Sequence, residues 1–415
     1  LRANPSSGNL HPTETYVIAS GVRGITDGLH HYHNRSHVLE QRAWNDEPTA
    51  PGLWLGFSSI HWREAWKYGE RAFRYCQHDI GHAVAAMRMA TALMGWDCAV
   101  VPGWTPAALA ALVGADREAD FEGAEAEEPA CLLAVAPALP DADRAGGLRR
   151  SMVGTSLAGA AQRGTWTGRA GRLSADRVQW DVIDAVAEAS RERETAEAVP
   201  VAARRSSPVP SRAAVMPAAA LLLQRRSAQS MDGSTATDAG RFASILRRLM
   251  PDAGPPFDAL WWTPRIHLVF FVHRVEGLQP GLYALARTEA ALGALRDGFS
   301  QDFAWVRPPG LPGDLPFFLL DHADCRAIAR QLSCGQDIAA DGCFSLGMIA
   351  EFDAALAEGG PAAYRRLFWE AGAVGQALYL EAEAAGLRGT GIGCFFDDGV
   401  HQLLGITGHA LQSLY

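Results

Sequence analysis

The sequence predicts an α+β protein made of two tandem copies of one unit, which would form an intramolecular pseudo-dimer. Two observations predict it. The stretch HPTETYVIASGV reads against TPRIHLVFFVHRV, with Pro12 matched to Pro264 at an offset of 252 and Gly28 to Gly281 at 253. Further along, four glycines of the first copy recur in the second at one offset of 291: Gly56 and Gly347, Gly81 and Gly372, Gly95 and Gly386, Gly114 and Gly405. Self-similarity at a fixed offset is the signature of a repeated structural unit.

Each copy is expected to hold the same elements in the same order. A run rich in Val, Ile and Phe, a turn, and a Gly-Leu that opens a second run predict a hairpin. A further strand follows around Gly56 or Gly347, and residues 79–96 and 370–387 then show the apolar spacing of a helix. A loop and a short helix complete the copy. The change of offset from 253 to 291 indicates an insertion in the second copy, around residues 287–342.

The predicted boundaries place the first unit at residues 1–139, a linker at 140–217 and the second unit at 218–415. The linker is rich in Ala, Arg, Ser and Pro around the stretch SPVPS. One helix is expected within it, from about Ser174 to Arg191, with a Ser at its N-cap.

Composition and charge narrow the class of protein. A chain of 415 residues with 48% apolar and 20% charged residues is typical of a soluble enzyme or binding protein. A formal net charge of -9 argues against a nucleic-acid surface and a polybasic membrane patch. The apolar windows are shorter than the roughly 20 residues of a spanning helix. We therefore expect a protein that binds neither nucleic acid nor membrane, and the cysteines, odd in number and without C-x-x-C spacing, add the expectation of a reducing cytoplasm.

Cysteine and histidine spacing predicts no metal site. The 7 cysteines are odd in number and show no C-x-x-C spacing, so thiols are expected rather than a disulfide framework or a zinc site. The group His30, His31, His33 and His37 could suggest a metal. Alternation along a strand places His30 on the face opposite His31 and His33, which favours polar strand surface.

The two copies differ most where a ligand could bind. The first copy has the polar loop PSSGNLHP at residues 5–12, whereas its counterpart FDALWWTP at 257–264 has lost the small and polar groups. The second copy keeps RGTGIGCFFDD at residues 388–398, where the first has WDCAVVPGWTP. The second copy also begins with QRRSAQSM, at residues 224–231. A two-fold dimer builds equivalent sites at its interface, so this complementary loss leaves the parts of one site.

Two of these stretches have the chemistry of a nucleotide site. Arg225, Arg226 and Ser227 could bind a phosphate, because guanidinium groups match phosphate oxygens bidentately. The alternative is a solvated helix start. The glycines of residues 389–393 would let backbone N–H groups approach a flat ligand, and the alternative is a helix C-cap and turn. The spacing G-x-G-x-G after a helix does not fit a Rossmann fingerprint.

These motifs resemble the FMN-dependent nitroreductase-like family, in its tandem branch of SagB-type thiazoline/oxazoline dehydrogenases. The resemblance covers both copies and rests on PSSGNLHP, GLHHYHNRSHVLE, KYGERAFRY, QHDIGHA, RRS and GTGIGCFFDD. It implies an FMN site shared between the copies. The residues implied to bind FMN are Pro5, Ser6, Ser7 and Asn9 of the first copy, with Arg225, Arg226, Ser227, Gly389, Gly391, Ile392 and Gly393 of the second.

The resemblance also implies a reaction. In azoline dehydrogenases a Lys-Tyr pair supplies the base, and Lys67 and Tyr68 match it. The functional interpretation places Lys67 in a partly desolvated pocket, and the alternative is a solvated Lys beside a packing Tyr at a helix start. The expected substrate is a peptide azoline or a small molecule, and a cyclodehydratase complex is an expected partner.

The missing initiator Met, and an end at Tyr415 before the family's C-terminal basic residue, lead us to expect clipping at both ends.

Two other functions stay open. One is an NAD(P)H-dependent nitroreductase or quinone reductase. The other is a flavin-free pseudoenzyme that serves as a partner in a peptide-modifying complex. The sequence feature that favours this pseudoenzyme is Gln229, which stands where the family opening Arg-Arg-Ser-x-Arg-x-Phe has its third Arg.

Overall fold

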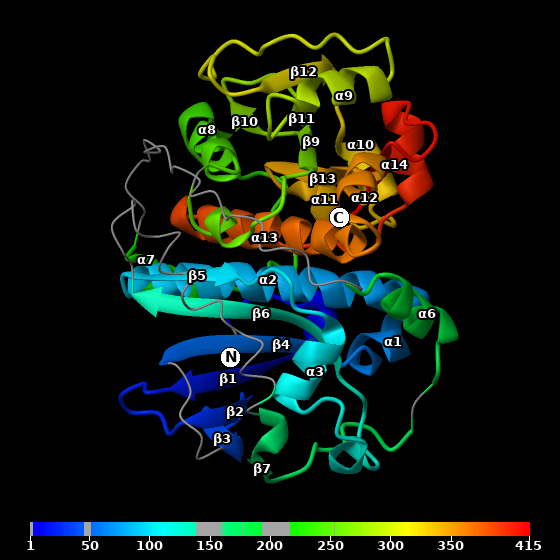
Figure 1. Ribbon diagram of the computed structural model, residues 1–415. Helices are drawn as coiled ribbons and strands as arrows, with labels where there is room; N and C mark the ends of the chain where they lie inside the picture. Colours follow the sequence, from blue (N-terminus) through cyan, green and yellow to red (C-terminus); the bar gives the residue numbers. More distant parts are fainter. Residues whose placement is uncertain are drawn as a thin grey trace. The chain divides into compact units, whose positions relative to one another are not determined.

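The structure is a computed structural model, and it describes residues 3–44, 51–137, 159, 161–176, 178–192, 216–252 and 254–415 (Figure 1). The chain divides into two compact units. Unit 1 comprises Leu1–Arg205 and Pro255–Trp261, and unit 2 comprises Ser206–Gly254 and Trp262–Tyr415. Both units combine an antiparallel sheet with helices, which is the predicted α+β class. The boundaries at residues 139/140 and 217/218 stay a prediction from the sequence.

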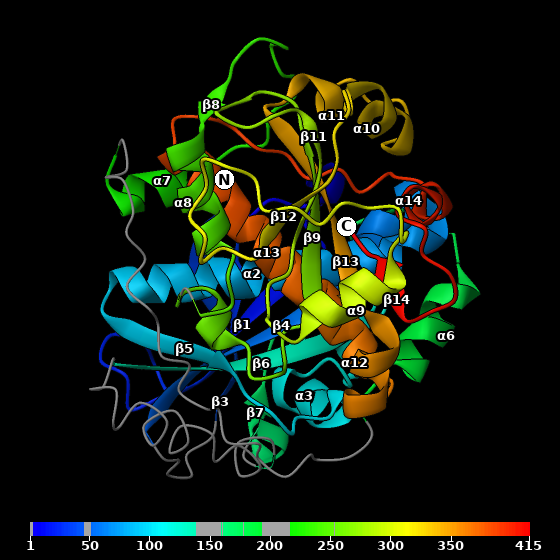
Figure 2. The same ribbon diagram turned by 90° about the horizontal axis from the view of Figure 1, so that it is seen from above.

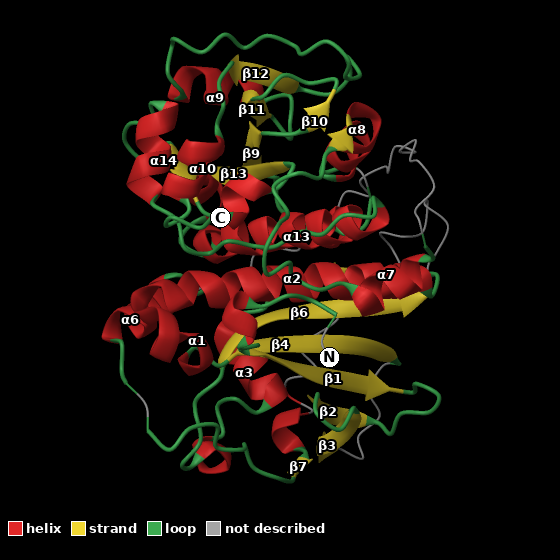
Figure 3. Ribbon diagram, turned by 180° about the vertical axis from the view of Figure 1, so that it is seen from behind, coloured by secondary structure: helices red, strands yellow, loops and turns green. Residues whose placement is uncertain are grey.

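Unit 1 is built on a seven-stranded sheet in the order β5-β6-β4-β1-β2-β3-β7. Its strands are β1 (Thr13–Ser20), β2 (Gly28–His33), β3 (Val38–Trp44), β4 (Gly52–Ser59), β5 (Trp96–Val100), β6 (Glu128–Pro137) and β7 (Thr165–Trp166). Its helices are α1 (Trp62–Tyr68), α2 (Ala72–Leu93), α3 (Pro106–Val113) and α6 (Asp181–Ala189). Helix α2 runs alongside the sheet (Figures 1 and 3). Helix α3 packs on the face that carries Tyr16 and Ile18.

Unit 2 is built on a five-stranded sheet in the order β12-β11-β9-β13-β14. Its strands are β9 (Ile266–Val272), β11 (Gly281–Leu285), β12 (Phe317–Asp321), β13 (Phe344–Glu351) and β14 (Leu411–Ser413), and β8 (Thr237–Asp238) pairs separately with β10 (Val275–Glu276). Its helices are α7 (Ala218–Gln224), α8 (Ala239–Arg248), α9 (Ala291–Gly298), α10 (Arg326–Leu332), α11 (Ile338–Asp341), α12 (Phe352–Gly359), α13 (Ala363–Ala384) and α14 (Asp397–Leu404). Helices α10 and α11 lie side by side (Figure 2).

The two sheets repeat one pattern of strand pairing. The order β6-β4-β1-β2-β3 of unit 1 corresponds to β14-β13-β9-β11-β12 of unit 2. The register is repeated as well. In unit 1 Tyr16 pairs with Gly56, and in unit 2 Val269 pairs with Gly347. Val269 lies 253 positions after Tyr16, and Gly347 lies 291 positions after Gly56, which are the two offsets that the sequence shows. Residues at these offsets therefore occupy equivalent positions in the two sheets.

Helices repeat in the same way. Helices α2 and α13 are each 22 residues long, and they begin at Ala72 and Ala363, which are 291 positions apart. The short helices α3 and α14 each end at a glycine in the left-handed conformation, Gly114 with φ 79° and Gly405 with φ 73°. A side chain at either position would strain the backbone, which explains why both copies carry Gly there.

Some predicted boundaries were wrong. Helices α2 and α13 begin before Asp79 and Glu370, because their first turns carry polar and aromatic side chains that are buried and so mask the apolar period. The linker helix is α6, which starts at Asp181 without a side-chain cap, not at Ser174. Strand β7 pairs with β3, so part of the predicted linker belongs to the sheet of unit 1. The predicted insertion contains β12, the counterpart of β3.

No helix in the described part of the chain is both long and apolar enough to cross a membrane.

Candidate functional site

The polar loop of unit 1 is held by its own turn and by two buried carboxyl groups. Ser7–Asn9 form a single 3-10 turn, which follows the buried Pro5. The Ser7 N–H donates to Asp79 Oδ1 of α2 at 3.3 Å, and the Ser6 hydroxyl donates to Glu64 Oε1 of α1 at 3.5 Å. The loop is therefore anchored on α1 and α2, and Asn9 at its far end is exposed.

Lys67 and Tyr68 lie directly beside this loop. A Cβ added to Gly8, whose φ is +56°, would stand 2.5 Å from Tyr68 Oη and 2.9 Å from Lys67 Nζ. The Lys67 ammonium lies 5.1 Å from the centre of the Tyr68 ring. Gly8 is thus required both by its backbone conformation and by the space that the Lys-Tyr pair occupies.

Two expectations about Lys67 need correction. The pair lies at the C-terminal end of α1, which begins at Trp62 and ends where Gly69 turns the chain with φ 55°. Lys67 is exposed, which agrees with the alternative of a solvated Lys and not with the partly desolvated pocket of the functional interpretation. A side chain in the last turn of a short helix, next to a reversal of the chain, has few neighbours to cover it.

Glu64, one helical turn before Lys67, was missed at the sequence level. Its side chain is fully buried, with 0% of the residue exposed. Burial raises the pKa of the Glu64 carboxyl to about 9, and the charge of Asp79 adds to the rise. Glu64 is therefore a neutral acid at pH 7, directly beneath the loop. Its position could have been inferred from the sequence, because a Glu three positions before Lys67 on a predicted helix lies on the same helix face as Lys67.

In unit 2, Tyr379 of α13 joins the Arg-Arg-Ser segment to the Gly-rich loop. Its hydroxyl accepts the Gly391 N–H at 2.7 Å and shares a hydrogen bond of 2.9 Å with the Ser227 hydroxyl. The Arg225 guanidinium lies over the Tyr379 ring, 5.0 Å from its centre, and Arg225 is buried. Two stretches far apart in the chain thus meet at one phenol.

Glu383 holds the same segment one turn further along α13. Its carboxylate accepts the Gln224 amide at 3.2 Å and the Arg226 N–H at 3.4 Å, and its Oε1 lies 3.9 Å from Arg388 Nε. The Arg226 guanidinium turns back onto the backbone, where it donates to the carbonyls of Leu223 and Arg225 at 3.1 and 2.7 Å.

A cavity of about 440 Å³ lies in unit 2 beside these groups. Tyr379, Arg388 and Ser345 line it, and the buried Ser345 hydroxyl has no hydrogen-bond partner among the described residues. Of the site residues that the sequence predicted in this unit, Gly389, Gly391 and Ile392 line the cavity, whereas Arg225, Arg226, Ser227 and Gly393 do not. The Arg-Arg-Ser segment therefore lies behind the cavity wall, and its Ser227 hydroxyl bonds to Tyr379, which lines the cavity.

Two of the clustered histidines on β2, His30 and His31, have ordinary polar partners. His31 Nε2 lies 2.9 Å from Glu14 Oε2, and His30 Nε2 lies 3.0 Å from the Thr26 hydroxyl. Among the residues that the structure describes, no group of three His, Cys, Asp or Glu side chains could hold a metal ion.

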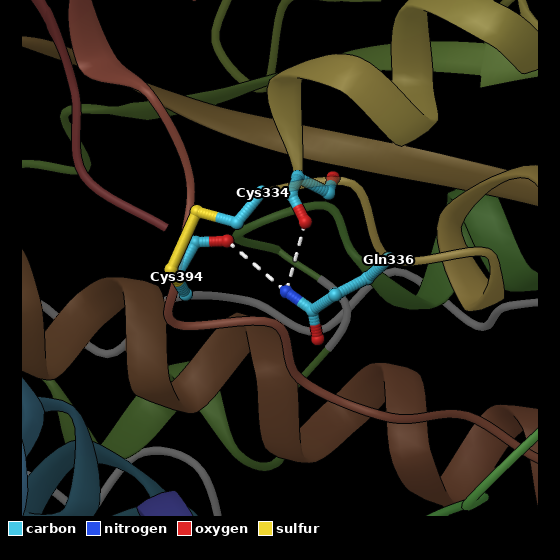
Figure 4. The surroundings of a disulfide bond; sticks show 4 residues. Cys334, Gln336 and Cys394 are labelled. Carbon is cyan, nitrogen blue, oxygen red and sulfur yellow. Dashed lines mark hydrogen bonds between the residues drawn. A yellow bond between two sulfur atoms is a disulfide. The ribbon is translucent and has the colours of Figure 1, made fainter.

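A disulfide joins two segments of unit 2 whose neighbouring residues Ser333 and Phe395 line the cavity. Cys334, just after α10, is bonded to Cys394, just after the Gly-rich loop, and Gln336 donates to the carbonyls of Ser333 and Cys394 at 2.9 and 3.3 Å (Figure 4). The expectation that these cysteines are thiols was wrong. Spacing along the sequence does not reveal a bond between loops 60 residues apart that only folding brings together.

Replacing Cys394 by Ser is expected to lower the stability of unit 2 by about 2–4 kcal/mol, because the cross-link restricts the unfolded chain. Urea unfolding without reductant measures the difference. Cys343→Ser, at a half-buried free cysteine, is the matched control and should have a smaller effect. Adding dithiothreitol should lower the midpoint of the wild type and leave Cys394→Ser unchanged. A wild type that is insensitive to reductant would contradict this prediction.

Comparison with known proteins gives a family match within unit 2. Residues 320–415, which include Tyr379, Arg388 and the Gly-rich loop, match the model of the Nitroreductase family. The solved structure of a protein assigned as a nitroreductase from Anabaena variabilis is similar with a TM-score of 0.70 at 19% identity, over 100% of this chain and 81% of that one. No curated protein matches the sequence.

Two other solved structures are less similar. A chain of the Escherichia coli microcin synthetase McbBCD complex with truncated pro-MccB17 has a TM-score of 0.28 at 18% identity, over 33% of this chain and 56% of that one. A protein assigned as a nitroreductase from Ralstonia eutropha has a TM-score of 0.32 at 18% identity, over 50% of this chain and 84% of that one. The chain thus has a nitroreductase-like α+β fold and carries a Nitroreductase family match in residues 320–415.

Proposed function

We propose that this chain is an FMN-dependent oxidoreductase whose cofactor binds at the cavity of unit 2. The observation that carries the proposal is Tyr379, which brings Ser227 and Gly391 together at the edge of that cavity. The resident groups fit such a cofactor. A volume of about 440 Å³ falls in the range of roughly 300–1,000 Å³ for small-molecule sites. The unpaired Ser345 hydroxyl and the loop backbone suit the polar edge of a flavin ring.

For the reaction, we propose the oxidation of an azoline in a peptide. Conversion of an azoline to an azole removes a proton from one ring carbon and a hydride from its neighbour. FMN, when bound, supplies two-electron hydride chemistry. Lys67 would accept the proton, and Tyr68 would orient the same ring. The support for these roles is the contact of both side chains with the loop at Gly8. A cyclodehydratase complex, which makes azolines, remains the proposed partner.

The participation of the unit 1 loop in the FMN site rests on the sequence alone. The complementary loss between the two copies predicts that Pro5, Ser6, Ser7 and Asn9 complete the site formed by unit 2. It therefore predicts one FMN per chain rather than two.

One observation favours a second function, an NAD(P)H-dependent reductase of nitroaromatics or quinones. Lys67 is exposed, and a base that removes a carbon-bound proton works better when water is excluded. Such a reductase needs no base at this position.

The purified chain is expected to bind one FMN, and Tyr379→Phe should bind it about two- to tenfold more weakly. Phe keeps the ring and lacks the hydroxyl, so the variant would lose a binding free energy of about one ordinary hydrogen bond or slightly more. Titration followed by flavin fluorescence measures both. Tyr283→Phe is the matched control, because Tyr283 donates to the Gln279 carbonyl at 2.7 Å and does not line the cavity. Equal effects of both variants, or two FMN per chain, would contradict the proposed site.

The reaction is tested with two substrates. A peptide that carries a thiazoline or oxazoline should lose two hydrogens, as measured by mass spectrometry. Reduction of a nitroaromatic by NAD(P)H without any change in the peptide would instead establish the second function. A colourless protein that also fails to take up added FMN would leave the flavin-free pseudoenzyme as the function, in line with Gln229.

A further inference from the structure

Arg388 has a position in unit 2 that the sequence did not indicate. It is the one Lys or Arg among the described residues that line the cavity. Two carboxylates, Asp232 and Asp341, also line it. Both carboxylates would repel an anionic group in the cavity. Such a group is therefore expected to bind where a positive charge offsets this repulsion.

Arg388 also lies next to the Arg-Arg-Ser segment. Its Nε is 3.9 Å from Glu383 Oε1, the oxygen that accepts the Arg226 N–H at 3.4 Å. The residue that follows it, Gly389, accepts the Ala228 N–H at 3.0 Å. Arg388 therefore stands where the cavity, the Gly-rich loop and the Arg-Arg-Ser segment meet.

The three arginines of this region differ in how firmly their guanidinium groups are held. Arg225 is buried over the Tyr379 ring, and Arg226 donates to two backbone carbonyls. The Arg388 side chain is 57% exposed, and its ion pair with Glu383 is long at 3.9 Å. A long, exposed ion pair contributes little to stability, so the Arg388 guanidinium can turn to a ligand at small energetic cost.

We propose that Arg388 binds the anionic end of the ligand in this cavity. Given the proposed function, on which this inference rests, that group is the phosphate of FMN. A guanidinium fork matches two phosphate oxygens, and a charge-assisted bond of this kind is about twice as strong as a neutral one. Arg226, which the sequence singled out, then acts mainly by shaping the backbone of its segment.

Riboflavin separates a phosphate contact from a structural effect, because it has the flavin ring of FMN and lacks the phosphate. Arg388→Ala should bind FMN about ten- to a hundredfold more weakly and riboflavin with unchanged affinity. Arg388→Lys keeps the charge without the fork and should lie between wild type and Arg388→Ala for FMN. Arg226→Ala should weaken FMN less than Arg388→Ala does. Raising the salt concentration should weaken FMN more than riboflavin in the wild type, and this difference should shrink in Arg388→Ala.

Arg241→Ala is the matched control, because Arg241 is an exposed arginine of unit 2 that pairs with Asp238 at 3.6 Å. It should leave both affinities unchanged. Equal losses for FMN and riboflavin in Arg388→Ala would mean that Arg388 only holds the loop, and unchanged FMN binding would place the phosphate elsewhere. Either result overturns the inference while the wild type still binds FMN. A wild type that binds neither flavin would overturn the proposed function itself, and the inference with it.

Discussion

Replacing Lys67 by Ala is expected to abolish azoline oxidation and to leave FMN binding intact. In the proposed reaction Lys67 removes the proton from the ring carbon, and general-base catalysis contributes about 10²- to 10⁴-fold to the rate. Lys67 is not among the residues proposed to bind FMN, and its side chain is exposed. The variant should therefore still bind FMN and have it reduced by dithionite. Mass spectrometry of the azoline peptide over time measures the rate.

Lys67→Arg distinguishes a base from a positive charge. Arginine keeps the charge and much of the length, but it is not deprotonated in proteins. If Lys67 acts as a base, Lys67→Arg should be as inactive as Lys67→Ala. Activity of Lys67→Arg near that of the wild type would reduce Lys67 to an electrostatic role. Activity of Lys67→Ala at the wild-type rate would remove the residue-level support for the dehydrogenase and favour the NAD(P)H-dependent reductase.

Replacing Arg287 by Ala is expected to destabilise unit 2 by about 3–5 kcal/mol, the usual effect of breaking a buried ion pair by removing one partner. Arg287 is 2% exposed. Its Nη1 donates to Glu370 Oε1 at 2.5 Å and to the Ile266 carbonyl at 2.9 Å, and its Nε donates to the Leu249 carbonyl at 2.7 Å. These bonds join α13 to β9 and to the end of α8. The variant would leave the Glu370 carboxylate buried without its cation.

Chemical unfolding followed by tryptophan fluorescence measures this loss. Arg247→Ala is the matched control, because Arg247 pairs with the exposed Asp314 at 3.0 Å and such pairs contribute at most about 1 kcal/mol. The double variant Arg287→Met, Glu370→Leu removes both charges and should recover part of the lost stability. The interpretation would be wrong if Arg287→Ala unfolded at the same urea concentration as Arg247→Ala, or if the double variant were less stable than the single one.

The repeat could be derived from the sequence because it depends on local backbone requirements. Gly114 and Gly405 end equivalent helices with positive φ, a conformation that other residues rarely adopt, so glycine persists in both copies. The same offsets predict the register, since Tyr16 pairs with Gly56 where Val269 pairs with Gly347. The contact of the Lys-Tyr pair with the loop at Gly8 was not visible in sequence, although both motifs were.

Other features were decided only by the tertiary structure. The bond between Ser227 and Tyr379 spans 152 residues, and the disulfide between Cys334 and Cys394 spans 60. The exposure of Lys67 and the burial of Glu64, three residues apart on one short helix, likewise follow from what packs around α1. The sequence by itself determined the repeated topology and the candidate loops, because backbone conformation and apolar spacing are local properties. Which side chains meet at the cavity, and which charges are desolvated, depends on segments that approach one another only after the chain has folded.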